Sequence, residues 1–293
     1  MKLLILGKSS YTAELFLNQS KVDTSIITLY KKKFDKDDIM NLDENSFFSK
    51  YFLELNENFQ CTLNFIHIHE SDPDLEIKIN SKLCTKFKFA FNRMKVPKNI
   101  FLSSVNSSKH ANTAYGKAKF NCEEIYRTIE NSIIVRSSTI IEIDFENKLI
   151  KGGKKGRSLG SLNSIIDRNY LIPVPGKGDY LQTVCFGDDL GKFLNLILSN
   201  NRYENKTVNF FTGEFLTYNQ FLNIIFNFKK IKRFKIFIPI FFINYSLKIL
   251  NFIIPRLNIS NKNIENLTNQ KIEFDYSNEI KEFIKLKKFK DLT

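Results

Sequence analysis

The chain has 293 residues, of which 43% are hydrophobic, and it carries a formal net charge of +13 at pH 7. These values place it among globular proteins with a sizeable core. The four cysteines are scattered without the spacing of disulfides or zinc ligands, which predicts reduced thiols and no metal site. The apolar run at the N-terminus is too short for a signal peptide, and together with the reduced thiols this predicts a cytoplasmic protein.

The positive charge would attract nucleic acid, anionic lipid or phosphorylated substrates. The lysines are dispersed among acidic residues, and no helix-turn-helix, zinc-finger or RNA-binding signature accompanies them. We therefore expect no nucleic-acid partner. A substrate that carries a diphosphate suits the charge better.

The first predicted elements are an apolar strand at residues 3–6, a turn at Gly7 and a helical pattern. This strand, turn and helix form the context in which the start of a helix binds a phosphate group. Ser9, Ser10 and Tyr11 follow the glycine and are candidates for that contact. A plain turn between a strand and a helix is the alternative.

Further along, residues 96–104 predict a short strand that ends in Ser103 and Ser104, and residues 114–131 predict a helix. Tyr115 and Lys119 are four residues apart, so they share one face of that helix. A nearby ammonium stabilises a phenolate, and the Ser104 hydroxyl can bond the same substrate oxygen. The three groups predict proton transfer, whereas a chance Tyr-x-x-x-Lys on an exposed helix is the alternative.

Six segments resemble, in order, the extended short-chain dehydrogenase/reductase superfamily of NAD(P)-dependent nucleotide-sugar epimerases, dehydratases and reductases. They are IFLSSV (100–105), YGKAK (115–119), IIVRSSTII (133–141), VPGKGDYLQTVCFGDDLGKFL (174–194), VNFFTGEFLTYNQFLNII (208–225) and FDYSNEIKEFIKLKKF (274–289). The resemblance implies an α/β fold, a Rossmann-like doubly wound parallel sheet with a small C-terminal substrate-binding lobe. It also implies hydride chemistry, with Ser104, Tyr115 and Lys119 as the catalytic residues.

The cofactor end departs from the family. Its three-glycine loop is represented by Gly7, Ser10 and Ala13, so only the first glycine is kept. LNFIHIHE (63–70) resembles the family's fourth strand, but His69 and Glu70 replace two alanines that usually pass beneath the cofactor. The cofactor-binding residues implied by the resemblance are Gly7, Ser9, Ser10, Tyr11, Lys31, Lys32, His67, Tyr115, Lys119 and Ser137, the last in place of the family's usual proline.

The second predicted strand, residues 25–30, is followed by Lys31, Lys32 and Lys33. A cation at this place accommodates a 2′-phosphate, whereas a carboxylate would favour the ribose diol. The expected cofactor is therefore NADP, with NAD as the alternative. A solvated lysine turn is the competing interpretation.

Substrate contacts are expected from a helix asparagine, Asn80, and from the loop at residues 148–160, which is rich in glycine and lysine. The cations Lys154, Lys155 and Arg157 in that loop are candidates for binding a substrate diphosphate. A solvated connection is the alternative for the loop, and an ordinary polar helix position is the alternative for Asn80.

We expect residues 1–150 to form the dinucleotide-binding domain and residues 151–293 to form the rest of the sheet and the substrate-binding lobe. Residues 234–255 are the most hydrophobic segment, but polar residues and Pro239 interrupt it. This pattern predicts a buried or interfacial helix rather than a membrane span. Peripheral membrane contact and a homodimer are left open.

The sequence thus predicts an NAD(P)-dependent epimerase or keto-reductase that acts on a nucleotide-linked sugar. Two alternatives stay open. One is a non-catalytic NAD(P)-binding scaffold protein with a degenerate glycine loop, and the other is a membrane-associated reductase with residues 234–255 against a bilayer.

Overall fold

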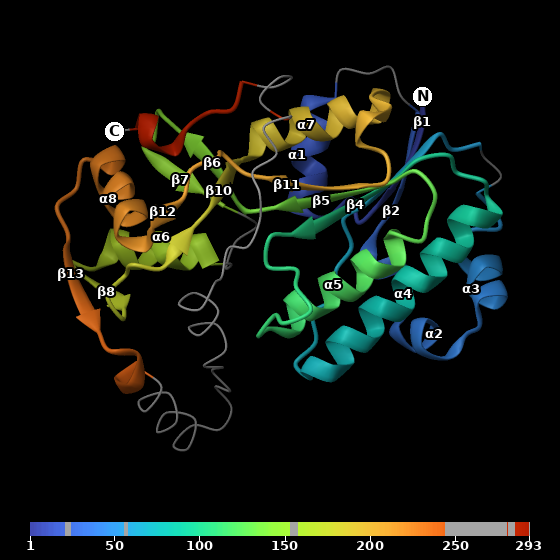
Figure 1. Cartoon of the computed structure of the whole chain (residues 1–293), viewed down its shortest axis with the longest axis horizontal. Helices are drawn as coiled ribbons and strands as arrows, with labels where there is room; N and C mark the ends of the chain where they lie inside the picture. The colour runs from blue at the N-terminus through green and yellow to red at the C-terminus, as the bar shows by residue number, and fades with distance from the viewer. Residues whose placement is uncertain (21–24, 56–57, 153–157, 244–279, 281–284, 293) are drawn as a thin grey trace. The chain divides into compact units, whose positions relative to one another are not determined.

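The computed structural model describes residues 1–20, 25–55, 58–152, 158–243, 280 and 285–292 (Figure 1). The chain divides into two compact units. The first comprises Met1–Ser138, Gly187–Phe210 and Tyr276–Lys285, and the second comprises Thr139–Phe186, Phe211–Asp275 and Leu286–Thr293. Each is described by itself below.

The first unit is built on a six-stranded parallel sheet in the order β11-β5-β4-β3-β1-β2. Its strands are β1 (Lys2–Leu6), β2 (Ser25–Leu29), β3 (Cys61–Asn64), β4 (Asn99–Ser104), β5 (Ser132–Ser137) and β11 (Lys206–Phe210). The four apolar residues of β1 after Lys2 are completely buried, as expected of a parallel strand covered on both faces. The strand order reverses between β1 and β3, which is where open sheets of this kind bind ligands.

Helices cover both faces of this sheet, so the expected doubly wound fold is confirmed. Figure 1 shows α1 and α7 on one face and α4 and α5 on the other. The helices of the unit are α1 (Tyr11–Gln19), α2 (Lys36–Asn41), α3 (Glu44–Tyr51), α4 (Pro73–Arg93), α5 (Ala114–Tyr126) and α7 (Gly187–Ser199). A serine, threonine or aspartate side chain caps the first turn of each of the first five, which fixes where these helices begin.

The segment expected as a fourth strand occupies a different position. Between β2 and β3 the described residues form a 3₁₀ turn (Lys31–Lys33), α2 and α3, so β3 is the third strand of the described sheet. β3 also ends at Asn64 rather than continuing through Glu70. The Asn64 side-chain oxygen accepts the Ile66 N–H at 2.9 Å, and its amide donates to the Tyr126 hydroxyl at 2.8 Å. The Asn64 side chain therefore makes hydrogen bonds where the next residue of a neighbouring strand would otherwise pair with β3.

The described part of the second unit contains small sheets and the helices α6 (Ser158–Arg168) and α8 (Tyr218–Lys229). A three-stranded sheet joins β10 (Val184–Phe186), β6 (Thr139–Asp144) and β7 (Leu149–Lys151). Two-stranded sheets join β12 (Leu216–Thr217) to β9 (Leu181–Gln182) and β13 (Phe234–Ile238) to β8 (Leu171–Pro175). Apolar residues of α8 pack with Phe289 and with residues of β6, β8 and β10 to form the core of this unit.

The hydrophobic segment at residues 234–255 does not begin as a helix. Its first five residues form β13, which pairs in parallel with β8, and Pro239 separates this strand from helical residues 240–243. The prediction of a helix from Phe234 was therefore wrong for β13, and the part beyond Ile243 lies outside the described residues. Among the described helices, none combines the length and apolar character needed to cross a bilayer.

A buried carboxylate fastens α5 to the centre of the sheet. Glu123 on α5 is completely buried and accepts a hydrogen bond from Ser103 Oγ of β4 at 2.5 Å. Arg136 of β5 binds the same carboxylate through two nitrogens, at 2.9 and 2.6 Å, and Arg127 Nη2 donates to it at 3.0 Å. Because bidentate arginine pairing fixes geometry as well as charge, this network sets the position of α5 on β4 and β5.

Replacing this carboxylate should destabilise the first unit. We expect Glu123→Ala to lower the free energy of unfolding by about 3 kcal/mol or more, since two arginines lose their buried partner. Glu124→Ala removes the neighbouring, exposed carboxylate and should change stability by less than about 0.5 kcal/mol. Urea denaturation measures both, and equal losses in the two variants would contradict the role given to Glu123.

Candidate functional site

The turn after β1 requires glycine at its first position. Gly7 has a φ of +88°, and its N–H donates to the Leu29 carbonyl at 2.7 Å. A Cβ added to Gly7 would lie 2.9 Å from Ile66 Cγ1 and 3.2 Å from the Ile66 nitrogen. The turn therefore packs directly against the segment that follows β3, at the reversal of strand order, and a side chain has no room there.

The other predicted cofactor residues near this turn lie at the carboxyl ends of β1 and β2. Ser10 caps α1, with its hydroxyl accepting the Ala13 N–H at 3.1 Å, while Ser9 is exposed and Tyr11 is half-buried. Lys31 and Lys32 lie in the 3₁₀ turn directly after β2, the strand that pairs with β1. The structure thus brings the N-terminal turn and the lysines to one edge of the sheet.

Ser104 and Ser137 end neighbouring strands and lie opposite each other in the β4–β5 register. Both are largely buried. Ser104 Oγ accepts the Asn106 N–H at 3.2 Å, and Ser137 Oγ donates to the Ser103 carbonyl at 3.4 Å. The Ser104 oxygen is used here as an acceptor, which leaves its O–H as a hydrogen-bond donor for another group.

Tyr115 and Lys119 lie in the first turns of α5. Tyr115 is half-buried, whereas Lys119 is only 4% exposed. Lys119 Nζ donates to the Leu102 carbonyl of β4 at 2.8 Å, and it lies 4.7 Å from the ring centre of Phe101 and 5.9 Å from that of Tyr115. The Lys119 ammonium therefore lies beside the tyrosine ring and also donates a hydrogen bond to β4.

The loop before α5 is packed closely on its first turn. A Cβ at Gly116 would lie 2.5 Å from the Asn106 carbonyl oxygen and 2.7 Å from Ala111 Cβ. Gly116 thus allows the loop from β4 to lie against the helix beside Tyr115. Thr113 supports the same turn, because its side chain accepts the Gly116 N–H at 3.0 Å.

Two histidines pack against the tyrosine ring. The ring centre of Tyr115 lies 4.7 Å from that of His67 and 6.0 Å from that of His69. His67 Nε2 lies 2.8 Å from Glu76 Oε1, and His69 Nδ1 lies 3.5 Å from the same oxygen. Sequence reasoning named His67 as a cofactor residue but assigned no role to Glu76. The signal that could have found this group is the His-x-His spacing followed by an acidic residue in the first turn of the next helix.

Burial and hydrogen bonding shift both partners of the His67–Glu76 pair. Burial lowers the pKa of His67 to about 3, although its hydrogen bond with Glu76 opposes that shift. Burial of Glu76 would raise its pKa, but hydrogen bonds with His67 and with the Glu70 N–H hold that pKa below its ordinary value. The pair therefore consists of a neutral imidazole beside a carboxylate.

Asn80 on α4 holds the histidine segment in place. Its side-chain oxygen accepts the Ile68 N–H at 2.9 Å, and its amide donates to the carbonyls of Ile68 and Glu76, each at 2.7 Å. These bonds fix the backbone between His67 and His69. A substrate contact by Asn80 stays a prediction. The other predicted substrate residues, Lys154, Lys155 and Arg157, lie outside the described residues.

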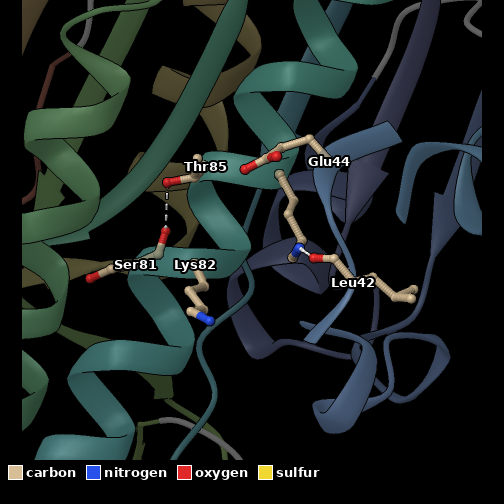
Figure 2. A pocket seen from close by; sticks show the side chains of 6 residues that line it. Leu42, Glu44, Ser81, Lys82 and Thr85 are labelled. Atoms are coloured by element: carbon tan, nitrogen blue, oxygen red, sulfur yellow. Dashed lines mark hydrogen bonds between the residues drawn. The ribbon is translucent and has the colours of Figure 1, made fainter. Parts of the chain in front are cut away.

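A separate small pocket of about 240 Å³ lies between the start of α3 and α4 (Figure 2). It is smaller than typical ligand sites. Lys82 Nζ donates to the Met40 carbonyl at 2.6 Å, and Lys86 Nζ donates to the Leu42 carbonyl, so both amines bind the carboxyl end of α2. We assign this pocket a structural role. It is lined by Leu42, Glu44, Ser81, Lys82, Thr85 and Lys86.

No family model and no curated protein sequence matches the chain. Solved structures do match its fold. A dTDP-4-dehydrorhamnose reductase from Clostridium acetobutylicum has a TM-score of 0.63 at 18% identity, over 82% of this chain and 84% of that one. The same enzyme from Bacillus anthracis, in complex with NADP, has a TM-score of 0.63 at 15% identity, over 81% and 84%. A UDP-glucuronic acid 4-epimerase from Bacillus cereus, in complex with UDP-glucuronic acid and NAD, has a TM-score of 0.62 at 13% identity, over 82% and 86%.

These structures are of nucleotide-sugar reductases and epimerases, the enzymes that the sequence motifs resemble. At identities of 13 to 18% the likeness establishes the fold. The predicted Rossmann-like α/β architecture is therefore confirmed. The roles of the individual site residues rest on the geometry given above.

The buried His67 should make stability depend on pH. Because its pKa is about 3 in the folded protein and about 6.5 when unfolded, the unfolded chain binds a proton that the folded protein does not. Stability is then lost as the pH falls below about 6.5, by up to about 1.4 kcal/mol per pH unit. Urea denaturation between about pH 7 and about pH 5, with EDTA present, should show this slope.

The matched variants are His67→Gln, whose amide can still donate to Glu76, and His110→Gln, which changes an exposed histidine. The first should flatten the slope and the second should keep it. An unchanged slope in His67→Gln would show that another group is responsible.

Proposed function

We propose that the chain is an NAD(P)-dependent oxidoreductase-type enzyme that epimerises or reduces a nucleotide-linked sugar. The observation that carries the proposal is the hydrogen bond from Lys119, one helical turn after Tyr115 on α5, to the Leu102 carbonyl of β4, the strand that ends in Ser104. The fold in which this arrangement occurs is shared with nucleotide-sugar reductases and epimerases. Fold and side-chain chemistry thus support the same reaction class.

The N-terminal turn fits a dinucleotide. The positive φ of Gly7 and the close approach of Ile66 are features of a tight turn that leads into a helix start, where N–H groups and the dipole favour a pyrophosphate. Ser9, Ser10 and Tyr11 follow that turn. Lys31 and Lys32, at the end of the neighbouring strand, favour the 2′-phosphate of NADP, while NAD is the alternative. His67, Ser137, Tyr115 and Lys119 would then lie toward the nicotinamide end.

In the proposed reaction the protein's own groups manage the proton. A bound nicotinamide would supply or accept the hydride. The Tyr115 hydroxyl would transfer a proton to or from the substrate oxygen, and the Ser104 O–H would donate a hydrogen bond to the same oxygen. The Lys119 ammonium, which has three N–H donors and gives one to Leu102, would stabilise the phenolate.

The substrate proposal rests on charge and on the ligand of one structural neighbour. The Bacillus cereus epimerase was crystallised with UDP-glucuronic acid. A nucleotide diphosphate suits a chain with a net charge of +13, and we propose that Lys154, Lys155 and Arg157 bind it, with Asn80 near the sugar. Homodimer formation and peripheral membrane contact stay predictions.

A second candidate is a non-catalytic NAD(P)-binding scaffold protein, and the histidines favour it. His69 packs on the Tyr115 ring, and with Glu70 it stands where the resemblance places two small alanines beneath the cofactor. The enzyme candidate predicts turnover of a nucleotide-linked sugar, whereas the scaffold candidate predicts none. They agree in predicting that the dinucleotide binds the folded protein.

The experiment combines thermal shift with activity. NADPH or NADH should raise the melting temperature, since a ligand that binds only the folded state stabilises it. The turnover assays use dTDP-4-dehydrorhamnose with NADPH for reduction and UDP-glucuronic acid with NAD for epimerisation. Tyr115→Phe should keep the thermal shift and lose about 10²-fold to 10⁴-fold in kcat.

Tyr170→Phe removes an exposed hydroxyl of the second unit and serves as the control, with unchanged kcat expected. Wild-type turnover in Tyr115→Phe would overturn the proton relay. A thermal shift without turnover on any nucleotide sugar would favour the scaffold, and the absence of a shift would contradict both candidates.

A further inference from the structure

Two of the three histidines in the chain converge on one carboxylate. His67, His69 and Glu76 each offer a ligand atom, and these atoms all lie within 4.8 Å of one another. His67 Nε2 and His69 Nδ1 approach the same oxygen, Glu76 Oε1, at 2.8 and 3.5 Å. The side chains of His67 and Glu76 are 9% and 8% exposed, while that of His69 is 47% exposed.

The backbone holds this group in place. The histidines are two residues apart, and the Asn80 amide fixes both polar groups of Ile68 between them. Glu76 lies in the first turn of α4, and its second oxygen accepts the Glu70 N–H at 3.1 Å. Hydrogen bonds therefore hold the backbone that carries the two histidines and the Glu76 carboxylate. Supporting hydrogen bonds of this kind are typical of metal ligands in proteins.

We propose that His67, His69 and Glu76 form a binding site for a divalent transition-metal ion, with Zn²⁺ as the best match. Two imidazoles and one carboxylate are a common zinc ligand set, and the fourth position is then taken by water or another small ligand. Zinc lies about 2.0–2.2 Å from such ligands, which places neighbouring ligand atoms of a tetrahedron about 3.3 Å apart. The separations of 2.8 and 3.5 Å lie on either side of this value.

The metal would take the place of the proton that His67 Nε2 now shares with Glu76. The imidazole stays neutral by carrying its proton on Nδ1. Because the His69 side chain is 47% exposed, a water molecule is available as the fourth ligand. The cysteine spacing predicted no metal site, and the proposed site uses no cysteine. It shares His67 with the proposed nicotinamide end of the dinucleotide site, and both histidine rings pack against Tyr115.

The test uses the full chain after EDTA treatment and removal of the chelator, without dinucleotide. ZnCl₂ is titrated by calorimetry, and CoCl₂ by visible absorption, in which tetrahedral Co²⁺ gives intense bands. We expect one equivalent of either metal to bind. His69→Ala and Glu76→Gln should each weaken binding at least about 100-fold, since loss of a direct ligand should cost no less than loss of a supporting residue.

His110→Ala is the matched control because it removes the remaining histidine, which is exposed. It should leave metal affinity unchanged. Circular dichroism checks that each variant is folded, and His69→Ala alters a half-exposed side chain. The proposal is overturned if the wild-type protein binds no equivalent of zinc, or if His69→Ala and Glu76→Gln bind it as tightly as His110→Ala does. NADPH thermal shifts are recorded separately, so failure of the metal site and failure of the proposed enzyme are distinguishable.

Discussion

The carboxylate of Glu123 is the fixed point around which the candidate site is arranged. It is fully buried, it is shared by Arg127 and Arg136, and it joins α5 to two central strands. Lys119 precedes Glu123 by one helical turn and bonds β4 as well. Because both residues anchor the same helix face to the sheet, Tyr115 at the start of α5 has little freedom to move relative to the ends of β4 and β5.

A second constraint acts on the segment whose histidines pack on the Tyr115 ring. The segment after β3 is packed against Gly7, and its backbone is fixed by Asn64 at one point and Asn80 at another. Its direction is therefore set by side-chain hydrogen bonds in place of a strand ladder. The two histidines reach the Tyr115 ring as a result. One rigid neighbourhood thus contains the groups assigned to proton transfer and the groups assigned to metal binding.

The sequence predicted most of the sheet because each strand and helix has a local pattern. The apolar run before Gly7 is typical of a buried parallel strand, and the pair Tyr115 and Lys119 has helical spacing. The sequence did not predict that β3 ends at Asn64. In a sequence pattern, an asparagine whose side chain ends a strand cannot be distinguished from any other polar residue. Nor did the sequence bring Glu76 to the histidines, because that approach depends on how α4 packs against the sheet rather than on its own periodicity.

The strand β11 has a consequence for synthesis of the chain. It pairs with β5, yet residues Thr139–Phe186 of the second unit, and then α7, lie between the two along the sequence. Until β11 leaves the ribosome, β5 presents an open row of backbone donors and acceptors. A nascent or truncated chain that stops before residue 206 would therefore expose an unpaired strand edge. It should depend on chaperones to avoid aggregation.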